Sequence, residues 1–121
     1  MKLSGEAKLL RIFCGESDKA GNVMLYEALM MKARETGISG CTVTRGIAGF
    51  GAASRIHTAK ILRLSEDLPL VLEFVDTQEK IDEFIQTACK IVEDAACGAL
   101  MTEEKVNIIK YTHGKGETIK K

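Results

Sequence analysis

The chain lacks any excess of charge of either sign, because 17 basic residues balance 17 acidic ones over 121 positions. There is therefore no whole-chain electrostatic attraction toward nucleic acid or an anionic membrane surface. No apolar run reaches the roughly 18 residues that a membrane helix needs. The N-terminal apolar run is too short and too charged for a secretory leader. We expect a cytoplasmic protein that neither binds nucleic acid nor inserts into a membrane.

The sequence also lacks the usual motifs of catalysis and metal binding. Its four cysteines form no CxxC pair, and only two histidines could join them, so neither a zinc signature nor a disulfide framework is visible. There is no GxSxG elbow, no phosphate-binding Walker loop and no acidic pair with metal-type spacing. We therefore predict no catalytic residue and no metal ligand, and we expect all four cysteines to be reduced: Cys14, Cys41, Cys89 and Cys97.

The hydrophobic pattern predicts six elements in the order strand, helix, strand, strand, helix, strand. This order is typical of the ferredoxin-like α+β sandwich, in which two helices cover one face of a four-stranded antiparallel sheet. We expect one domain over residues 1–121, with its core at about 8–111 and a flexible tail at 112–121. The expected elements are Leu9–Cys14, Val23–Thr36, Cys41–Ala48, Leu70–Val75, Asp76–Ala96 and Val106–Tyr111.

The third predicted strand is apolar on both of its faces. Leu70, Leu72 and Phe74 alternate with Val71 and Val75, and only Glu73 between them is polar. Because the helices can cover only one face, this pattern favours a partner on the other. We predict a homo-oligomer whose sheets face inward.

A glycine-rich strand end followed by basic residues is the candidate ligand site. Thr42-Val43-Thr44 runs toward Gly49-Phe50-Gly51, where glycine permits positive φ and close approach of a ligand. No acidic residue occurs between Arg45 and Ser65, and such a cationic stretch suits an anion. The alternatives are a hairpin turn with solvated cations, surface or intersubunit arginines, an exposed histidine, and a Phe50 that anchors the turn rather than stacking on a base. The candidate ligand-binding residues of the stretch are Arg45, Arg55, His57, Lys60 and Arg63.

Several runs resemble the PII-like superfamily of trimeric signalling proteins. The segments 37–44 and 49–51, with His57-Thr58 and Leu68-Pro69, are similar to the second strand, the long loop and the third-strand start of PII proteins. Over about residues 9–111 the chain more closely resembles an uncharacterised family of that superfamily, domain of unknown function 190. The runs that carry this resemblance are LLRIFCGESD (9–18), LYEAL (25–29), GIAGFG (46–51) and SRIHTAKILRLSEDLP (54–69).

The resemblance implies a homotrimer with a long loop at about residues 52–67 and an adenine nucleotide in the cleft between subunits. Carried over by motif, the nucleotide contacts are Thr42, Gly49, Phe50 and Gly51. The chain departs from PII in three ways. The step from Thr42 to Gly49 is one residue longer, which suggests a bulge or a shifted register. Leu70 replaces a phosphate-binding lysine, and residues 98–104 replace a glycine-lysine loop with a segment that ends in two glutamates.

These features favour a non-enzymatic regulatory trimer. An anionic ligand would order the loop at 52–67, which would then engage a partner protein. The family implies a membrane transporter, such as a fluoride exporter, as that partner. The alternative is a metal- or ion-responsive trimer of the cation-tolerance type, to which Cys41 and His57 could contribute. A small acyl-phosphate hydrolase is a third hypothesis, but its arginine-lined loop has no counterpart in residues 15–22, which contain no arginine.

Overall fold

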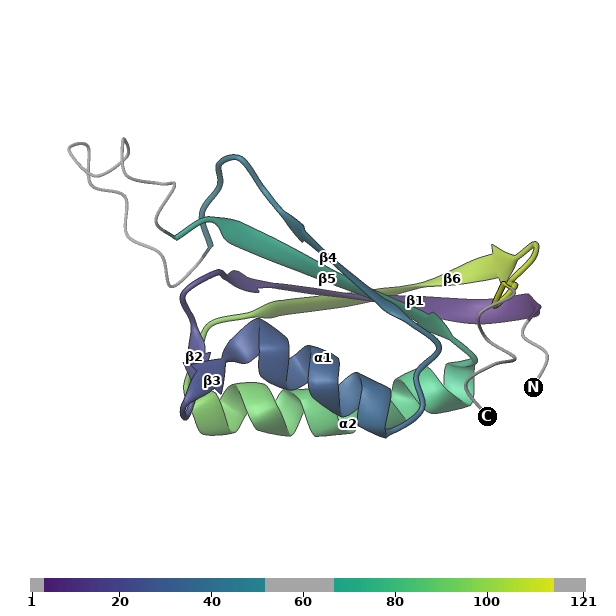
Figure 1. Cartoon of the computed structure of the whole chain (residues 1–121), viewed down its shortest axis with the longest axis horizontal. Coiled ribbons are helices and arrows are strands. Elements are labelled where there is room, and N and C mark those ends of the chain that lie inside the picture. Colours follow the sequence, from purple (N-terminus) through teal and green to yellow (C-terminus); the bar gives the residue numbers. More distant parts are fainter. Residues whose placement is uncertain (1–3, 52–66, 115–121) are drawn as a thin grey trace.

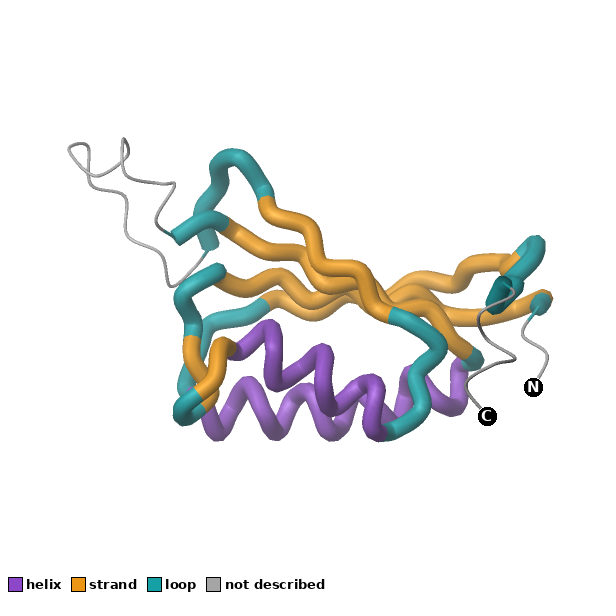
Figure 2. The backbone as a smooth tube through the Cα atoms, in the orientation of Figure 1, coloured by secondary structure: helices purple, strands orange, loops and turns teal. Residues whose placement is uncertain are grey.

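The computed structural model describes residues 4–51 and 67–114. Two helices lie side by side beneath one face of a twisted four-stranded antiparallel sheet (Figures 1 and 2). This is the predicted ferredoxin-like α+β architecture, with the strand order β4-β5-β1-β6 and a separate two-stranded hairpin formed by β2 and β3. The elements are β1 (Gly5–Gly15), β2 (Lys19–Ala20), β3 (Val23–Met24), α1 (Leu25–Glu35), β4 (Cys41–Arg45), β5 (Pro69–Asp76), α2 (Gln78–Ala95) and β6 (Leu100–Ile108).

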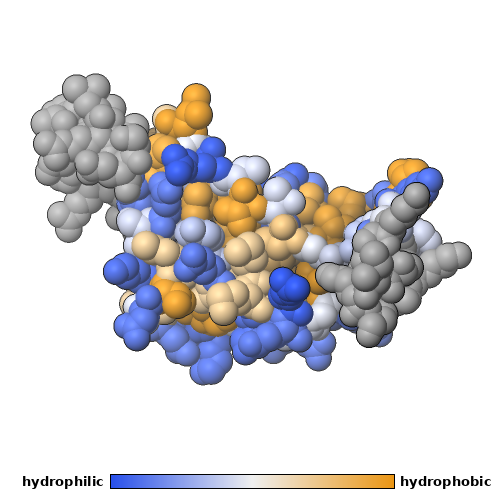
Figure 3. Space-filling view, viewed as in Figure 1, coloured by the Kyte–Doolittle hydropathy of each residue, from blue (hydrophilic) through white to orange (hydrophobic). Residues whose placement is uncertain are grey.

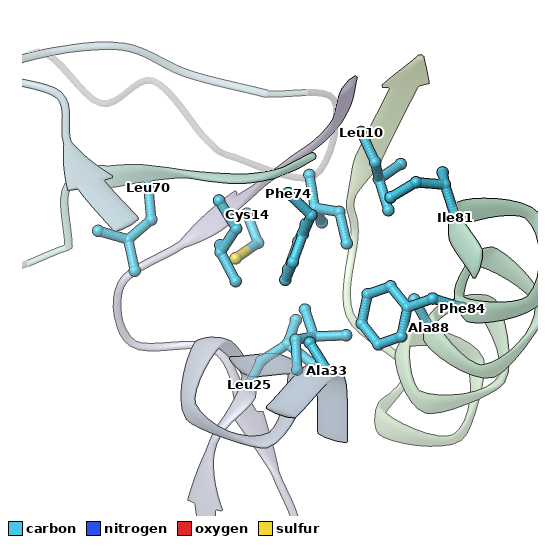
Figure 4. Close-up of a cluster of buried hydrophobic side chains, with 12 residues drawn as sticks. Leu10, Cys14, Leu25, Ala33, Leu70, Phe74, Ile81, Phe84 and Ala88 are labelled. Atoms are coloured by element: carbon cyan, nitrogen blue, oxygen red, sulfur yellow. The ribbon is translucent and has the colours of Figure 1, made fainter. Parts of the chain in front are cut away.

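The core lies between the sheet and the two helices (Figure 4). On β5 the side chains of Leu70, Leu72 and Phe74 point into it, as the alternation predicts. Phe74 stands opposite Leu10 of β1 and packs at 5.0 Å, ring centroid to centroid, against Phe84 of α2. The remaining core side chains are Ile12, Cys14, Leu25, Leu29, Ala33, Ile81 and Ala88.

Both helices end in a left-handed residue, but neither begins where the sequence pattern placed it. α1 begins at Leu25, since Val23 and Met24 belong to the short hairpin. It ends at a Schellman turn with Gly37 at φ +88°. α2 is capped by the side chain of Thr77, which accepts a hydrogen bond from the Lys80 backbone at 3.3 Å. Asp76, the residue at which the predicted element begins, therefore lies before the helix and does not cap it.

Three strand boundaries also differ from the prediction. β1 begins four residues earlier than expected, and β4 ends at Arg45 rather than at Ala48. β4 pairs with β5 in unbroken register from Cys41 to Arg45, so the expected bulge is absent there and the extra residue lies beyond the strand. β6 begins at Leu100, so residues 100–104, expected as a loop, are part of the sheet. Within the described ranges, no helix is both long and apolar enough to cross a bilayer.

Candidate functional site

The base of the long loop is fixed on both sides by backbone hydrogen bonds. On one side, the Gly46 amide donates to the Pro69 carbonyl at 2.7 Å. On the other, the Glu16 amide donates to the Leu68 carbonyl at 2.9 Å, which joins the end of β1 to the start of β5. The described residues on either side of the loop are therefore held together at one end of the protomer.

Arg45 is the one basic ligand candidate that lies in the described residues, and it already has a partner. Its Nη2 atom lies 3.1 Å from Oε2 of Glu16. Because Glu16 neutralises Arg45, the pair offers little net charge to an incoming anion. An ion pair this exposed stabilises the protein by only ~0–1 kcal/mol, so an anion could replace Glu16 as the partner of Arg45. The other basic candidates lie outside the described residues: Arg55, His57, Lys60 and Arg63.

The described part of this end is acidic rather than basic. The carboxylates of Asp18 and Asp67 converge on Gly15, where an added Cβ would lie 3.3 Å and 3.2 Å from their oxygens. Asp18 accepts a hydrogen bond from the Gly15 amide at 2.9 Å, and Asp67 accepts one from the Ser17 amide at 3.0 Å. A phosphate placed here would need cations from residues 52–66 or from another chain.

Two glycines after β4, Gly46 and Gly49, serve close packing rather than an unusual backbone conformation. Positive φ among the described glycines occurs at Gly5, Gly21, Gly37 and Gly114, not in the Gly-Phe-Gly motif. A Cβ added at Gly46 or Gly49 would lie 3.0 Å from Cγ of Pro69, so the chain needs glycine to fold against that ring. Phe50 is 74% exposed, which removes the alternative that it anchors the turn in the core.

Thr42 lies apart from the other motif residues within one protomer. It stands opposite Glu73 on the open face of the sheet, whereas Gly49 packs on Pro69, four residues earlier on β5. That separation is about 13 Å at the usual strand rise. The structure therefore brings Arg45, Gly49, Phe50 and Gly51 to one end of the protomer and leaves Thr42 nearer the middle of the sheet.

An ion-pair cluster near Thr42 was missed in the sequence. Nε of Arg11 lies 2.7 Å from Glu73, and Nη1 lies 3.3 Å from Glu104. The hydrogen bond to Glu73 raises the pKa of the Arg11 guanidinium above its ordinary value. The available signal was an arginine inside the otherwise apolar run LLRIFC. The two glutamates that end the segment 98–104 also have partners, because Glu103 pairs with Lys8 and Glu104 with Arg11.

The far end of the sheet holds a feature that sequence reasoning did not identify. The segment after β6 reaches the link between α1 and β4, where the Tyr111 hydroxyl donates to the Ser39 carbonyl at 2.7 Å. Beneath it lies an open cavity of about 480 Å³. Its walls come from Ser39, Gly40, Val75 and residues 106–111.

The cysteines give little support to a metal site. All four are free thiols, and burial raises the pKa of Cys41 to about 11. A high pKa disfavours the thiolate that a metal would require. Residues 4–51 and 67–114 contain no group of three or more His, Cys, Asp or Glu side chains arranged around a common ion position. His57, the other suggested contributor, lies outside these ranges.

Comparison with protein-family models gives a match that covers most of the chain. The family model of domain of unknown function 190, described as "Uncharacterized ACR", matches residues 7–108. A UPF0166 protein of Aquifex aeolicus (strain VF5) is 40% identical over 79 residues, which make up 65% of this chain and 75% of that protein. A UPF0166 protein of Methanocaldococcus jannaschii is 34% identical over 89 residues, 74% of this chain and 82% of that protein.

Comparison with solved structures shows a PII-like fold. CPII from Thiomonas intermedia K12, in a structure bound to ADP and bicarbonate, has a TM-score of 0.64 and 14% identity, covering 87% of this chain and 90% of CPII. A structure of CPII bound to ADP, AMP and acetate gives a TM-score of 0.63. A putative PII-like signaling protein from Thermus thermophilus has a TM-score of 0.57 and 17% identity, covering 90% of this chain and 94% of that one.

Proposed function

The chain belongs to the family called domain of unknown function 190, and from this membership and its PII-like fold we propose that it is a non-enzymatic regulatory protein. In this proposal it works in the cytoplasm as a single-domain chain that assembles into a homotrimer. A small anionic ligand, an adenine nucleotide, binds where subunits meet. The long loop at 52–67 then engages a partner protein, for which the family implies a membrane transporter.

The observation that carries the assembly is the open face of the sheet. α1 and α2 cover one face, while the other presents Leu9, Phe13, Val71 and Val75, all partly exposed around the Arg11 cluster. Burying apolar surface between subunits stabilises their association by about 25 cal/mol per Å² of surface removed from water. A sheet that is apolar on both faces is more stable with a second layer, and further copies of the same sheet would supply it.

The support for a nucleotide comes from the fold and from the loop base. The solved CPII structures contain ADP, in one case with AMP. In this chain the loop base is held together at Gly46 and Glu16, so a ligand bound there could favour one loop conformation over another. Since Asp18 and Asp67 disfavour phosphate, binding depends on the basic residues of the loop, and Arg55 is the first one to test.

Titration calorimetry on the intact chain tests this proposal. ADP and AMP are titrated separately, with bicarbonate, fluoride and divalent metal ions as further arms. We expect saturable ADP or AMP binding that Arg55→Ala weakens at least tenfold and that Arg34→Ala, a substitution on the exposed surface of α1, leaves unchanged. A response to metals alone would favour the ion-responsive alternative. Equal nucleotide affinity in the wild type and Arg55→Ala would contradict the proposed anion site.

A further inference from the structure

We propose that the outer surface of the helix layer is a docking site for a basic amphipathic helix of another protein. Its apolar part, the α1 patch, lies on α1 and the hairpin before it and consists of Val23, Met24, Ala28, Met30 and Met31. Its charged part is the acidic outer face of α2. The helix layer lies on the side of the protomer opposite the open face of the sheet, so the site depends on neither the assembly nor the ligand site proposed above.

The α1 patch is apolar surface that the core does not use. The buried side of α1 faces the core through Leu25 and Leu29. The outward side, which is normally polar in a surface helix, carries Ala28 and, one turn further on, Met31. Met31 is 58% exposed, and Val23 at the hairpin is 40% exposed. Figure 3 shows the resulting apolar surface over α1 and the hairpin, with hydrophilic surface below it.

The outer face of α2 is polar and acidic. Within α2, five acidic and two basic residues give a net charge of −3. Two of the five carboxylates have partners, because Asp82 pairs with Lys8 and Asp94 with Lys90. The other three make no ion pair in residues 4–51 and 67–114: Glu79, Glu83 and Glu93.

The packing of the two helices places the patch and these carboxylates on one surface. Lys80, near the start of α2, donates to the Gly37 carbonyl just after α1 at 2.8 Å. The Cys97 sulfur, just after α2, lies 3.5 Å from the Lys19 carbonyl in the hairpin before α1. The helices are therefore antiparallel, and the last turn of α2 lies near the end of α1 where the patch begins. Glu27, in the first turn of α1, adds a carboxylate that has no ion pair within the described ranges.

These properties select a basic amphipathic helix as the occupant. Methionine side chains are unbranched and polarisable, so they adapt to apolar partners of varied shape, and an amphipathic helix docks through its apolar face. Lysines and arginines beside that face would meet the unpaired carboxylates of α1 and α2. A second copy of the chain does not fit, because α2 is acidic and the two acidic and two basic residues of α1 cancel. An anionic membrane surface is disfavoured by the same acidic charge.

Fluorescence anisotropy with a synthetic peptide tests the docking site on the intact chain. The peptide is a labelled helix of about 15–20 residues with leucine along one side and lysine and arginine beside it. We expect saturable binding that weakens as the salt concentration rises, because exposed charge pairs are screened. A peptide of the same composition in scrambled order should bind at least tenfold more weakly. Equal affinity for the two peptides, or no binding of either, would overturn the proposal.

Substitutions in matched pairs test the two parts of the site. Met31→Gln removes apolar surface without changing charge and should weaken binding of the helical peptide at least fivefold, whereas Ile47→Gln, after β4, should not. Glu93→Gln should weaken binding at least twofold at low salt, whereas Glu6→Gln, on β1, should not. All four positions are exposed in the protomer, so the variants should fold. Equal effects within either pair would contradict the site.

Photo-cross-linking locates the bound peptide directly. One leucine of the peptide is replaced by p-benzoylphenylalanine, and the irradiated complex is digested for mass spectrometry. We expect cross-links to residues 23–31, and cross-links confined to residues 46–51 or 106–111 would overturn the proposal. Light scattering on Met31→Gln should give the same mass as the wild type, because the patch lies away from the open face of the sheet. A lower mass in Met31→Gln alone would show that the patch belongs to the assembly and would also overturn the docking site.

Discussion

Tyr111 donates a hydrogen bond from its hydroxyl to the carbonyl of Ser39, with 2.7 Å between the oxygens, across 72 residues of sequence. The Ser39 amide in turn donates to a carboxylate oxygen of Asp76 at 2.8 Å, and the Ser39 hydroxyl donates to the Val75 carbonyl. The segment after β6, the α1–β4 link and the end of β5 are therefore joined at one point. This junction forms a wall of the cavity at the far end of the sheet.

Removing the Tyr111 hydroxyl should loosen this junction without disturbing the core. Tyr111→Phe should lower the free energy of unfolding by about 0.5–1 kcal/mol, because the hydrogen bond is partly solvated. Urea denaturation at fixed protein concentration measures the change. Tyr26→Phe is the matched control, since the Tyr26 hydroxyl bonds to no residue in the described ranges. Equal effects of the two variants would show that the Ser39 contact contributes nothing.

Asp76 is the group on which the junction depends most. Its side chain is 1% exposed and accepts hydrogen bonds from the Ser39 and Thr77 amides at 2.8 and 2.6 Å. Asp76→Ala leaves two amides without acceptors, so we expect a loss of about 2–4 kcal/mol in the free energy of unfolding. Asp76→Asn, which keeps one acceptor oxygen, should lose less. Asp94→Ala, at an exposed position of α2, is the control and should change the free energy of unfolding by under about 0.5 kcal/mol. A loss in Asp94→Ala as large as that in Asp76→Ala would contradict the role given to Asp76 in the junction.

The Pro69 ring should make Gly49 intolerant of a side chain. A Cβ at position 49 would lie 3.0 Å from Cγ of Pro69, whereas one at Gly51 would meet no atom within 4 Å. Gly49→Ala should therefore lower the free energy of unfolding by about 1–3 kcal/mol through overpacking. Gly51→Ala should change it by under about 0.5 kcal/mol. Thermal denaturation of both variants is the measurement, and a neutral Gly49→Ala would show that the segment does not pack on Pro69.

Cys14 should make the protein less stable as the pH rises above 9. Burial, assisted by the charges of Asp18 and Asp67, raises the pKa of the Cys14 thiol to about 12. In the unfolded chain the thiol ionises near its ordinary value, so between about pH 9 and 12 the unfolded state binds fewer protons than the folded state. The free energy of unfolding then falls by up to about 1.4 kcal/mol per pH unit. Urea denaturation at pH 8, 9 and 10 should show a shallower decline in Cys14→Ala, and parallel declines would contradict this.

The order of the elements could be predicted from the sequence because the relevant patterns are local. The stripe of Ile81, Phe84 and Ala88 identifies α2, and the alternation from Leu70 to Phe74 identifies β5. β6 was misplaced because residues 100–104 contain few apolar side chains. They are held in the sheet by pairing with β1, including the contacts of Glu103 with Lys8 and Glu104 with Arg11. Such long-range partners leave no periodic signal.

The candidate site was less predictable than the fold, for the same reason. The basic stretch is visible in the sequence, but the pairing of Arg45 with Glu16 and the convergence of Asp18 with Asp67 depend on which strands adjoin. The Tyr111–Ser39 junction joins residues from opposite edges of the sheet. Only the three-dimensional arrangement shows that the end expected to be basic is acidic in its described part.

The most direct test of the proposed assembly is the mass of the wild-type protein in solution, measured by multi-angle light scattering after size-exclusion chromatography at tens of micromolar. We expect a single species with three times the 13.2 kDa mass of one chain. A species with the mass of one chain would contradict the assembly, because the apolar face of the sheet would then be open to water and no site could lie between subunits.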